Sequence, residues 1–134
     1  MSISRQDIQQ LLEEYQLVSE LLASLQAQHA TVTELLEELT TALDGVRLLK
    51  SGEEERLIHI GAGLFVRGTF ESKEVLTPLG ASYHAFLDLE NAERILRERI
   101  EEYSKLKTSL EENIGKLAER AAQIRGVLER LGVR

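Results

Sequence analysis

Two rows of apolar residues, each repeating at every seventh position, run through the first third of the chain. Eleven of the twelve positions in these rows are apolar, over six heptads. A repeat sustained this long is typical of an α-helical coiled coil. It predicts a helix over residues 4–50, with Ser4 and Asp7 forming a capping box at its start and Gly52 ending it. The two rows are Ile8, Tyr15, Leu22, His29, Leu36, Leu43 and Leu11, Val18, Leu25, Val32, Leu39, Val46.

The last third of the chain carries a second seven-residue repeat, and residues 88–131 are predicted to be a helix that begins at the N-cap Asp88. One row is clear: Leu89, Leu96, Tyr103, Leu110, Leu117, Ile124 and Leu131. The other is mixed, because Ala92, Leu106 and Val127 alternate with Arg99, Asn113 and Arg120. Ile100, Ile114, Ala121 and Leu128 supply apolar positions one residue further on.

The middle segment, residues 51–87, holds Pro78 and five of the nine glycines. It contains four short runs rich in β-branched and aromatic residues, which predict strands. Turns are expected at Gly61–Gly63, at Glu71–Lys73 and at Leu79–Ala81, so the strands form two hairpins.

The economical way to bury both seams is for the helices to fold back on each other. In that antiparallel pair, the residue numbers of facing residues sum to roughly 137. The charges favour the antiparallel pair, because its two free ends attract each other. Residues 1–28 carry one positive and four negative side chains, whereas residues 113–134 carry five positive and two negative. The predicted fold class is α+β, mainly α: a long antiparallel two-helix coiled coil joined by two β-hairpins. Because four short strands are too few for a core of their own, the hairpins are expected to pair with other subunits.

Composition narrows the functional classes. The formal net charge of −7 disfavours non-specific nucleic-acid binding. The chain has no cysteine, no apolar run long enough to span a membrane and no secretion-signal pattern, so a cytoplasmic protein is expected. The three histidines, His29, His59 and His84, lack metal-ligand spacing.

The glycines do not form a nucleotide-binding loop. Gly63, Gly68 and Thr69 lack the lysine and the following helix of a phosphate loop, and Val66 stands where a dinucleotide fingerprint needs glycine. The paired glutamates lie side by side on helices and splay apart. We therefore expect no enzyme and no cofactor.

Several apolar residues are expected to lie outside the seams near the free ends of the two helices. They either widen the contact between the helices or form an exposed surface that binds non-native chains or a partner helix. These candidate client-binding residues are Ile3, Leu12, Leu21, Leu128 and Val133.

With these features the sequence resembles the prefoldin family, and in particular its alpha class, over essentially the whole chain. The most specific match is the run from Ile60 to Val66, followed by the run from Pro78 to Ser82. These runs resemble the paired glycine-rich turns of alpha-class subunits, although Ser82 stands where glycine is common. An insert of 37 residues also favours the alpha class over the single-hairpin beta class.

The resemblance implies a single prefoldin-like domain over residues 1–134 and an ATP-independent chaperone without a cofactor. It implies a hexamer of two alpha-class and four beta-class subunits, whose hairpins assemble into intersubunit β-barrels. The coiled-coil tips would hold unfolded polypeptide and deliver it to a group II chaperonin. The residues expected to serve oligomerisation are Ile58, Ile60, Leu64, Val66, Phe70, Val75 and Leu76.

Three other interpretations stay open at this point. The chain could be a structural coiled-coil scaffold, although a plain tether needs only a turn between its helices. It could be an alpha-like subunit that assembles into filaments without beta subunits. An RNA-binding helical arm has the mildly basic segment 113–134 as its only support.

Overall fold

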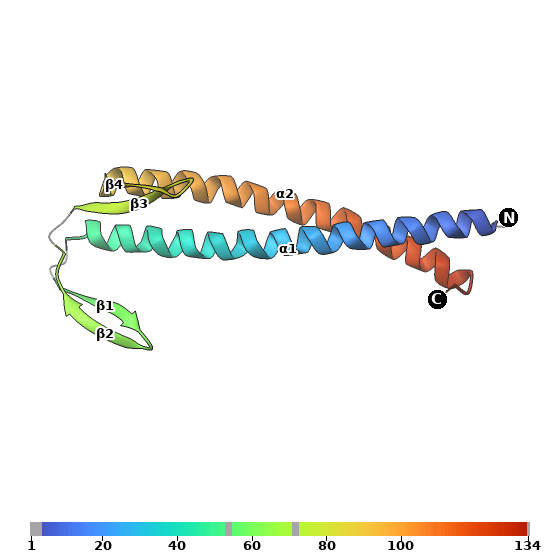
Figure 1. Ribbon diagram of the computed structural model, residues 1–134, viewed down its shortest axis with the longest axis horizontal. Coiled ribbons are helices and arrows are strands. Elements are labelled where there is room, and N and C mark those ends of the chain that lie inside the picture. Colours follow the sequence, from blue (N-terminus) through green and yellow to red (C-terminus); the bar gives the residue numbers. More distant parts are fainter. Residues whose placement is uncertain (1–3, 53–54, 71–72, 134) are drawn as a thin grey trace. The chain divides into compact units, whose positions relative to one another are not determined.

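The computed structural model describes residues 4–52, 55–70 and 73–133, and along the chain two long helices flank two β-hairpins (Figure 1). The predicted α+β, mainly α, fold class is confirmed. Ile3 and the first two residues of the predicted turn Glu71–Lys73 lie outside the described residues. The elements are α1 (Arg5–Lys50), β1 (Arg56–Gly61), β2 (Leu64–Gly68), β3 (Glu74–Gly80), β4 (Tyr83–Asp88) and α2 (Leu89–Arg130).

Both helices begin at side-chain caps that the sequence predicts. The Ser4 amide donates to Asp7 Oδ2 at 3.2 Å, and the Asp7 amide donates to Ser4 Oγ at 3.1 Å, which completes a capping box. Asp88 Oδ1 accepts a hydrogen bond from the Asn91 amide at 2.9 Å. These bonds satisfy amide groups that a helix leaves unpaired at its first turn.

Both helices end just before a glycine in the left-handed region. Gly52 follows α1 with φ of 77°, and Gly132 follows α2 with φ of 73°. After α2, the Gly132 amide donates to the Glu129 carbonyl and the Val133 amide donates to the Leu128 carbonyl, which is a Schellman motif. This motif turns the chain back over the last turn of α2.

The α1 seam is confirmed at every position. All twelve residues of the two predicted rows are buried or half-buried, whereas the leucines outside the rows at positions 12, 17, 21 and 48 are exposed.

The second seam row of α2, which the sequence left open, lies one residue beyond the mixed row. Ile100, Ile114, Ala121 and Leu128 are buried or half-buried. In the mixed row Ala92 is buried and Arg99 and Val127 are half-buried, whereas Leu106 is 44% exposed and Asn113 and Arg120 are exposed. The second seam row continues through two charged residues, Glu93 and Lys107, neither of which is exposed. This row follows the clear row by four residues, which is the alternation of three and four that a heptad seam requires.

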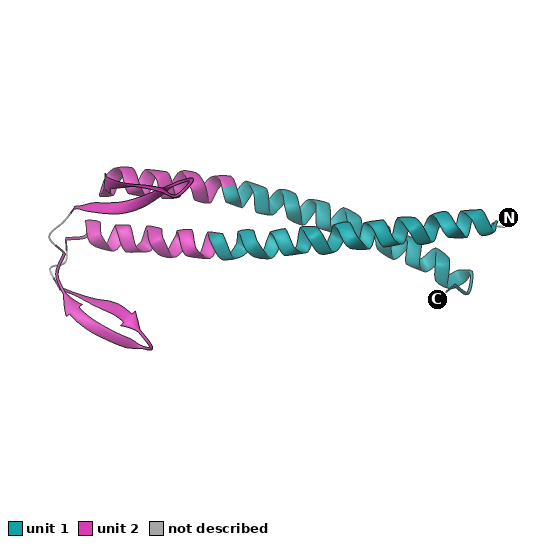
Figure 2. Ribbon diagram, viewed as in Figure 1, with its two compact units in different colours: residues 1–35, 103–134 teal, residues 36–102 magenta. Residues whose placement is uncertain are grey.

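The chain divides into two compact units, residues 1–35 with 103–134 and residues 36–102 (Figure 2). In the first unit, His29 Nε2 lies 3.1 Å from Glu111 Oε1, and Arg120 Nε donates to Glu14 Oε1 at 2.6 Å. In the second unit, Lys50 Nζ lies 2.7 Å from Glu90 Oε1. The residue numbers of these pairs sum to 140, 134 and 140. The helices are therefore antiparallel in each unit, close to the expected register.

Each hairpin contains one unpaired residue before its turn. The antiparallel register shifts between His59 and Gly61 in β1 and between Pro78 and Gly80 in β3, which is the mark of a β-bulge. Gly68 in β2 leaves room for Ile58, since a Cβ atom there would come within 2.7 Å of Ile58 Cδ1.

The turns of the two hairpins have the same backbone geometry, although glycine stands at the second turn position only in the first hairpin. Ala62 and Gly63 have φ of 50° and 76°, and Ala81 and Ser82 have φ of 49° and 66°. Two consecutive positive φ values are typical of type I′ hairpin turns. The second turn is thus centred on Ala81–Ser82, one residue later than predicted, because Ser82 adopts the left-handed conformation that Gly63 adopts without strain.

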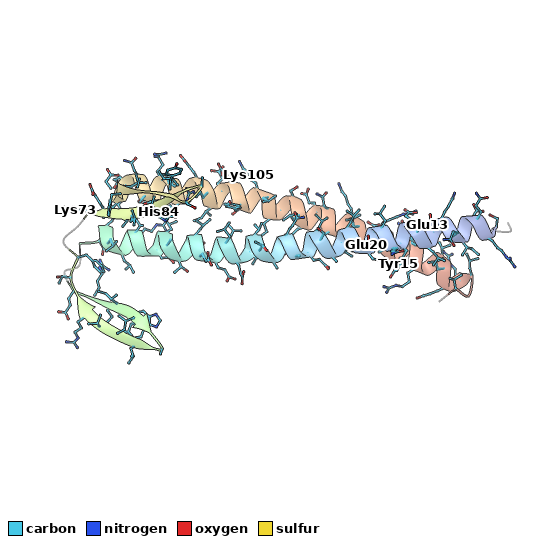
Figure 3. The ribbon with its side chains drawn as sticks, viewed as in Figure 1. Glu13, Tyr15, Glu20, Lys73, His84 and Lys105 are labelled. Atoms are coloured by element: carbon cyan, nitrogen blue, oxygen red, sulfur yellow. The ribbon has the colours of Figure 1, made fainter. Side chains whose placement is uncertain are left out.

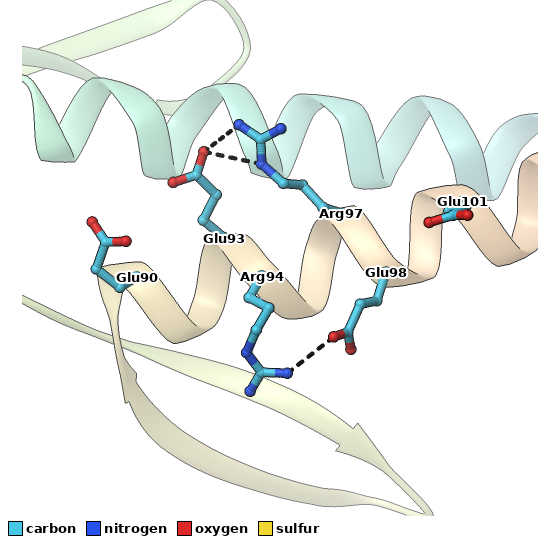
Figure 4. Close-up of a pocket in the computed structure, with 6 residues that line it drawn as sticks. All are labelled: Glu90, Glu93, Arg94, Arg97, Glu98 and Glu101. Carbon is cyan, nitrogen blue, oxygen red and sulfur yellow. Dashed lines mark hydrogen bonds and ion pairs between the residues drawn. The ribbon is translucent and has the colours of Figure 1, made fainter.

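A cluster of charges occupies the α2 seam beside the end of α1. Glu93 Oε2 accepts from Lys50 Nζ at 2.6 Å, and Glu93 Oε1 accepts from Arg97 Nη2 at 2.7 Å. The Glu93 side chain is only 12% exposed, and Lys50 and Arg97 lower the pKa of its carboxyl to about 2. Figure 4 shows Glu93 bonded to Arg97 and, on the same helix, Arg94 bonded to Glu98. The side chains of Arg94 and Glu98 are more than half exposed. The carboxylate of Glu93 is therefore much better shielded from solvent than that of Glu98 on the same helix.

We expect Ser82→Gly to stabilise the second hairpin by about 0.5–1 kcal/mol, because glycine adopts a positive φ without the strain of a Cβ atom. Amide hydrogen exchange in β3 and β4 measures the local opening free energy. Ser104→Gly in the interior of α2 is the matched control, and it should destabilise its surroundings by a similar amount. Faster exchange in the Ser82→Gly hairpin would contradict the turn assignment.

We expect Glu93→Gln to lower stability at neutral pH and to flatten its acid dependence. The pKa of Glu93 is lowered in the folded chain, so its contribution is complete above the ordinary carboxyl pKa of 4.5. That contribution is lost as the pH falls through about 2. Urea unfolding at a series of pH values measures the effect.

The control for this experiment is Glu98→Gln, which breaks an exposed pair and should change stability little. Equal acid sensitivity of the native chain and the Glu93→Gln chain would refute the role given to Glu93.

Candidate functional site

The first hairpin presents apolar side chains on both of its faces. Directly paired residues share a face, so Ile58 and Val66 lie on one side, and His59 and Phe65 on the other. The rings of His59 and Phe65 are 5.1 Å apart and tilted. Ile58 is half-buried, whereas the other large apolar residues of β1 and β2 are exposed: Leu57, Ile60, Leu64, Phe65 and Val66.

The second hairpin has one covered face and one exposed face. Val75, Ala85 and Leu87 are half-buried and Thr77 is buried, and alternation along β3 and β4 places all four on one face. Leu76 and Phe86 form a cross-strand pair on the opposite face, and they are 57% and 69% exposed.

The structure places the predicted oligomerisation residues on these two hairpins, apart from Phe70, which follows β2 and is exposed. Ile60, Leu64, Val66 and Leu76 are also exposed, and Ile58 and Val75 are half-buried. Sequence reasoning missed five exposed apolar residues of the hairpins: Leu57, Phe65, Leu79, Tyr83 and Phe86. In the sequence, apolar residues occupy consecutive positions of these strands and therefore lie on both faces. A search for alternating apolar and polar residues does not detect such strands.

Exposed apolar side chains on two-stranded sheets indicate surfaces that are covered in an assembly. Burial of one large apolar side chain contributes about 1.5–3 kcal/mol. An isolated two-stranded hairpin is marginal in water, and its edges leave unpaired backbone groups. The two hairpins therefore expose apolar side chains and strand edges that are suited to pairing with further strands.

Exposed leucines of α1 in the first unit lie on two sides of the helix. Leu17 and Leu21, four residues apart, share one face, whereas Leu12, nine residues before Leu21, lies on the opposite side. Leu12, Leu17 and Leu21 are 37%, 57% and 48% exposed. Leu12 and Leu21 are two of the predicted client-binding residues, and Leu17 is an exposed leucine that sequence reasoning missed. We refer to Leu12, Leu17 and Leu21 as the arm leucines.

The other two predicted client-binding residues that the structure describes, Leu128 and Val133, are less exposed than Leu12 and Leu21. The expectation that Leu128 lies off the seam is wrong, because it belongs to the second seam row of α2 and is 7% exposed. Val133 is half-buried, and its amide makes one of the two hydrogen bonds of the Schellman motif. Leu131, predicted as a seam residue, is 39% exposed, since it lies past the end of α2.

Charged side chains hold the two helices together beside the arm leucines. Arg120 donates to both carboxylate oxygens of Glu14, at 2.6 and 2.8 Å, and this bond lowers the pKa of Glu14. Arg125 donates to the Tyr15 hydroxyl at 2.9 Å and lies 6.0 Å from the centre of its ring. Figure 3 labels Tyr15 in this region. These contacts confirm the expected attraction between acidic α1 and basic α2.

The side chains with potential for chemistry are dispersed. Within residues 4–52, 55–70 and 73–133, no three His, Cys, Asp or Glu side chains come together in a way that would hold a metal ion. His84 is exposed on β4, far in sequence from His29, which contacts Glu111. None of the helices that the structure describes has the length and apolar character needed to cross a bilayer.

Comparison with known proteins gives consistent results. Residues 18–134 match the family model described as "Prefoldin subunit". The chain is 83% identical over 130 residues to the prefoldin subunit alpha of Pyrobaculum arsenaticum, covering 97% of this chain and 96% of that protein. It is 32% identical over 111 residues to the prefoldin subunit alpha of Saccharolobus islandicus, covering 81% and 76% of the two chains.

A solved structure shares the fold. It is the cryo-EM structure of filamentous PFD from Methanocaldococcus jannaschii, with a TM-score of 0.66 at 20% identity, covering 85% of this chain and 97% of that chain. Together with the heptad seams and the paired hairpins, these matches show that the chain belongs to the prefoldin family of chaperones, in its alpha class.

Proposed function

We propose that this chain is a subunit of an ATP-independent chaperone that holds unfolded polypeptides and delivers them to a group II chaperonin. The observation that carries the proposal is the exposure of apolar side chains at two places, on the hairpins and at the arm leucines. One surface serves assembly and the other serves client capture, and the chaperone acts in the cytoplasm without catalysis or a cofactor.

Assembly uses the hairpins. The exposed faces carrying Val66 and Leu76 pair with the hairpins of beta-class subunits in a hexamer of two alpha and four beta chains, where the strands close into β-barrels. A closed barrel removes the free strand edges that the isolated hairpins present.

Client capture uses the free ends of the helices. Each of the arm leucines contributes about 1–2 kcal/mol to the free energy of binding when a client buries it, so the helix pair of one subunit, here called an arm, binds a client weakly. Several arms in one assembly act together through effective concentration, which gives firm but reversible holding.

Self-assembly into filaments is the second candidate. It is supported by the structural likeness to a chain from a filamentous PFD and by the hairpin faces, whose apolar pairs suit a second copy of this chain as well as a beta subunit. Mass measurement of the purified chain, with and without a beta-class subunit, distinguishes the two assemblies.

We expect the double substitution Val66→Asp and Leu76→Asp to release monomers, because it places a buried charge on the interface of each hairpin. Light scattering measures the mass, and circular dichroism should show the helices intact. Thr69→Asp with Lys73→Asp adds aspartates outside the apolar pairs and should leave assembly unchanged. An unaltered mass in the first variant would rule out the hairpins as the interface.

We expect replacement of all three arm leucines by serine to abolish suppression of client aggregation without loss of assembly. The assay follows light scattering of a heat-unfolded client, with and without ATP, and nucleotide should make no difference. Leu48→Ser is the matched control, since Leu48 is an equally exposed α1 leucine in the other unit. Full protection by the triple variant would refute client capture at the arm leucines.

A further inference from the structure

The first residue of β1 bonds to the end of α1, and both lie in the second unit. The Nη2 atom of Arg56 donates to the Leu48 carbonyl and, at 3.1 Å, to Ser51 Oγ. Ser51 Oγ donates in turn to the same Leu48 carbonyl at 2.6 Å. Leu48 is one of the last four residues of α1, whose carbonyls lack a partner within a regular helix. Arg56 therefore joins the first hairpin to the backbone at the end of α1.

The positive charge of Arg56 suits this position, because a helix carries partial negative charge at its C-terminal end. The two basic residues in the last turn of α1 interact with α2. Arg47 Nε lies 3.5 Å from Glu93 Oε1, and Lys50 Nζ lies 2.7 Å from Glu90 Oε1. The guanidinium that bonds to the Leu48 carbonyl thus comes from the strand and not from the helix itself.

The second hairpin is attached to its helix in a different way. β4 ends at Asp88 and α2 begins at Leu89, so the strand leads directly into the helix. Asp88 also caps α2 through its bond with the Asn91 amide. The first hairpin, in contrast, is separated from α1 by residues 51–55, and the side chain of Arg56 spans this connection.

Apolar packing does little to hold the first hairpin, since most of its large apolar side chains are exposed. Its other arginine, Arg67, does not provide a link to α1 in this way. Arg67 Nε lies 3.7 Å from Glu55 Oε1, and the two side chains are 81% and 61% exposed. This pair joins β2 to the residue before β1. Arg56 and Arg67 therefore offer a matched comparison on one hairpin.

We propose that Arg56 is a positioning residue, which fixes the direction of the first hairpin relative to the end of α1 and so prepares the hairpin to pair with another subunit. The proposal rests on the proposed function, because it explains how one of the two assembly hairpins is presented. A hairpin that is already held in its bound direction loses less conformational freedom on association, so the assembly is more stable.

The first test is the stability of the assembly. Arg56→Met should raise about tenfold the concentration at which the subunits dissociate, because bonds from a charged donor are stronger than neutral ones. Light scattering over a dilution series, with and without a beta-class subunit, measures this concentration. Arg56→Lys keeps the charge without the planar guanidinium and should restore part of the stability. Arg67→Met is the matched control, and an equal effect of that substitution would overturn the proposal.

The second test measures the direction of the hairpin. Because the chain has no cysteine, spin labels can be attached through Asp44→Cys on α1 and Ala62→Cys at the hairpin turn, both at exposed positions. Dilution with unlabelled chain limits the measurement to distances within one chain. The distance distribution should be broader in Arg56→Met and unchanged in Arg67→Met. An equally narrow distribution in Arg56→Met would refute positioning by Arg56.

Two further measurements separate positioning from a role in folding of the hairpin. Amide hydrogen exchange in β1 and β2 should be the same in Arg56→Met and in the unmodified chain. If the hairpin unfolds in that variant, Ser51→Ala carries the test, because it removes one acceptor of Arg56 and leaves β1 intact. Ser51→Ala should weaken assembly, and adding it to Arg56→Met should weaken assembly no further. Additive effects of the two substitutions would contradict a shared contact.

The outcomes separate this proposal from the proposed function. An unaltered mass in the variant with Val66→Asp and Leu76→Asp would overturn the hairpin interface itself. If that variant dissociates while Arg56→Met assembles as firmly as the unmodified chain, the role of Arg56 alone is overturned.

Discussion

Burial of the two heptad seams is the interaction on which the rest of the structure depends. A helix with an apolar seam of six heptads is not stable alone in water, and α1 finds its partner in α2 of the same chain. The cross-helix pairs at His29 and at Arg120 fix the antiparallel direction in the first unit. Once the seams face each other, the apolar side chains left outside them become the surfaces available to other molecules.

The hairpins follow a different principle, because their apolar residues have few partners within the chain. Thr77 is the only buried residue of the described hairpin strands, whereas most of their large apolar side chains are exposed. The helices thus bury the apolar residues of their heptad rows within the chain, whereas the hairpins leave most of their large apolar residues exposed. This contrast within one chain is the physical reason for proposing assembly at the hairpins and client capture on the helices.

Most of the helical architecture was predictable because heptad spacing and caps are local signals. Ser4, Asp88 and Gly52 mark helix ends in the sequence and in the structure. The second α2 row was not decided by the sequence, because Leu106 and Ile100 both offered apolar rows and only packing chooses between them. Leu128 was misplaced for that reason. The groove lined by Ala27, Thr31 and Leu106 was not predictable, since it depends on small α1 residues lying opposite Leu106 on α2.

The charged cluster around Glu93 also affects the alignment of α1 with α2. A shift of one heptad between α1 and α2 would bring the carboxylate of Glu93 opposite Leu43 or Thr40 in place of Lys50 and Arg47. After such a shift Glu93 would keep Arg97 of its own helix but lose Lys50 and Arg47, which makes the shifted alignment less favourable, whereas the apolar seam residues tolerate the shift. Apolar burial alone would allow several alignments of two repetitive helices. The contacts of Glu93 therefore favour the observed alignment of the two repeats over one shifted by a heptad.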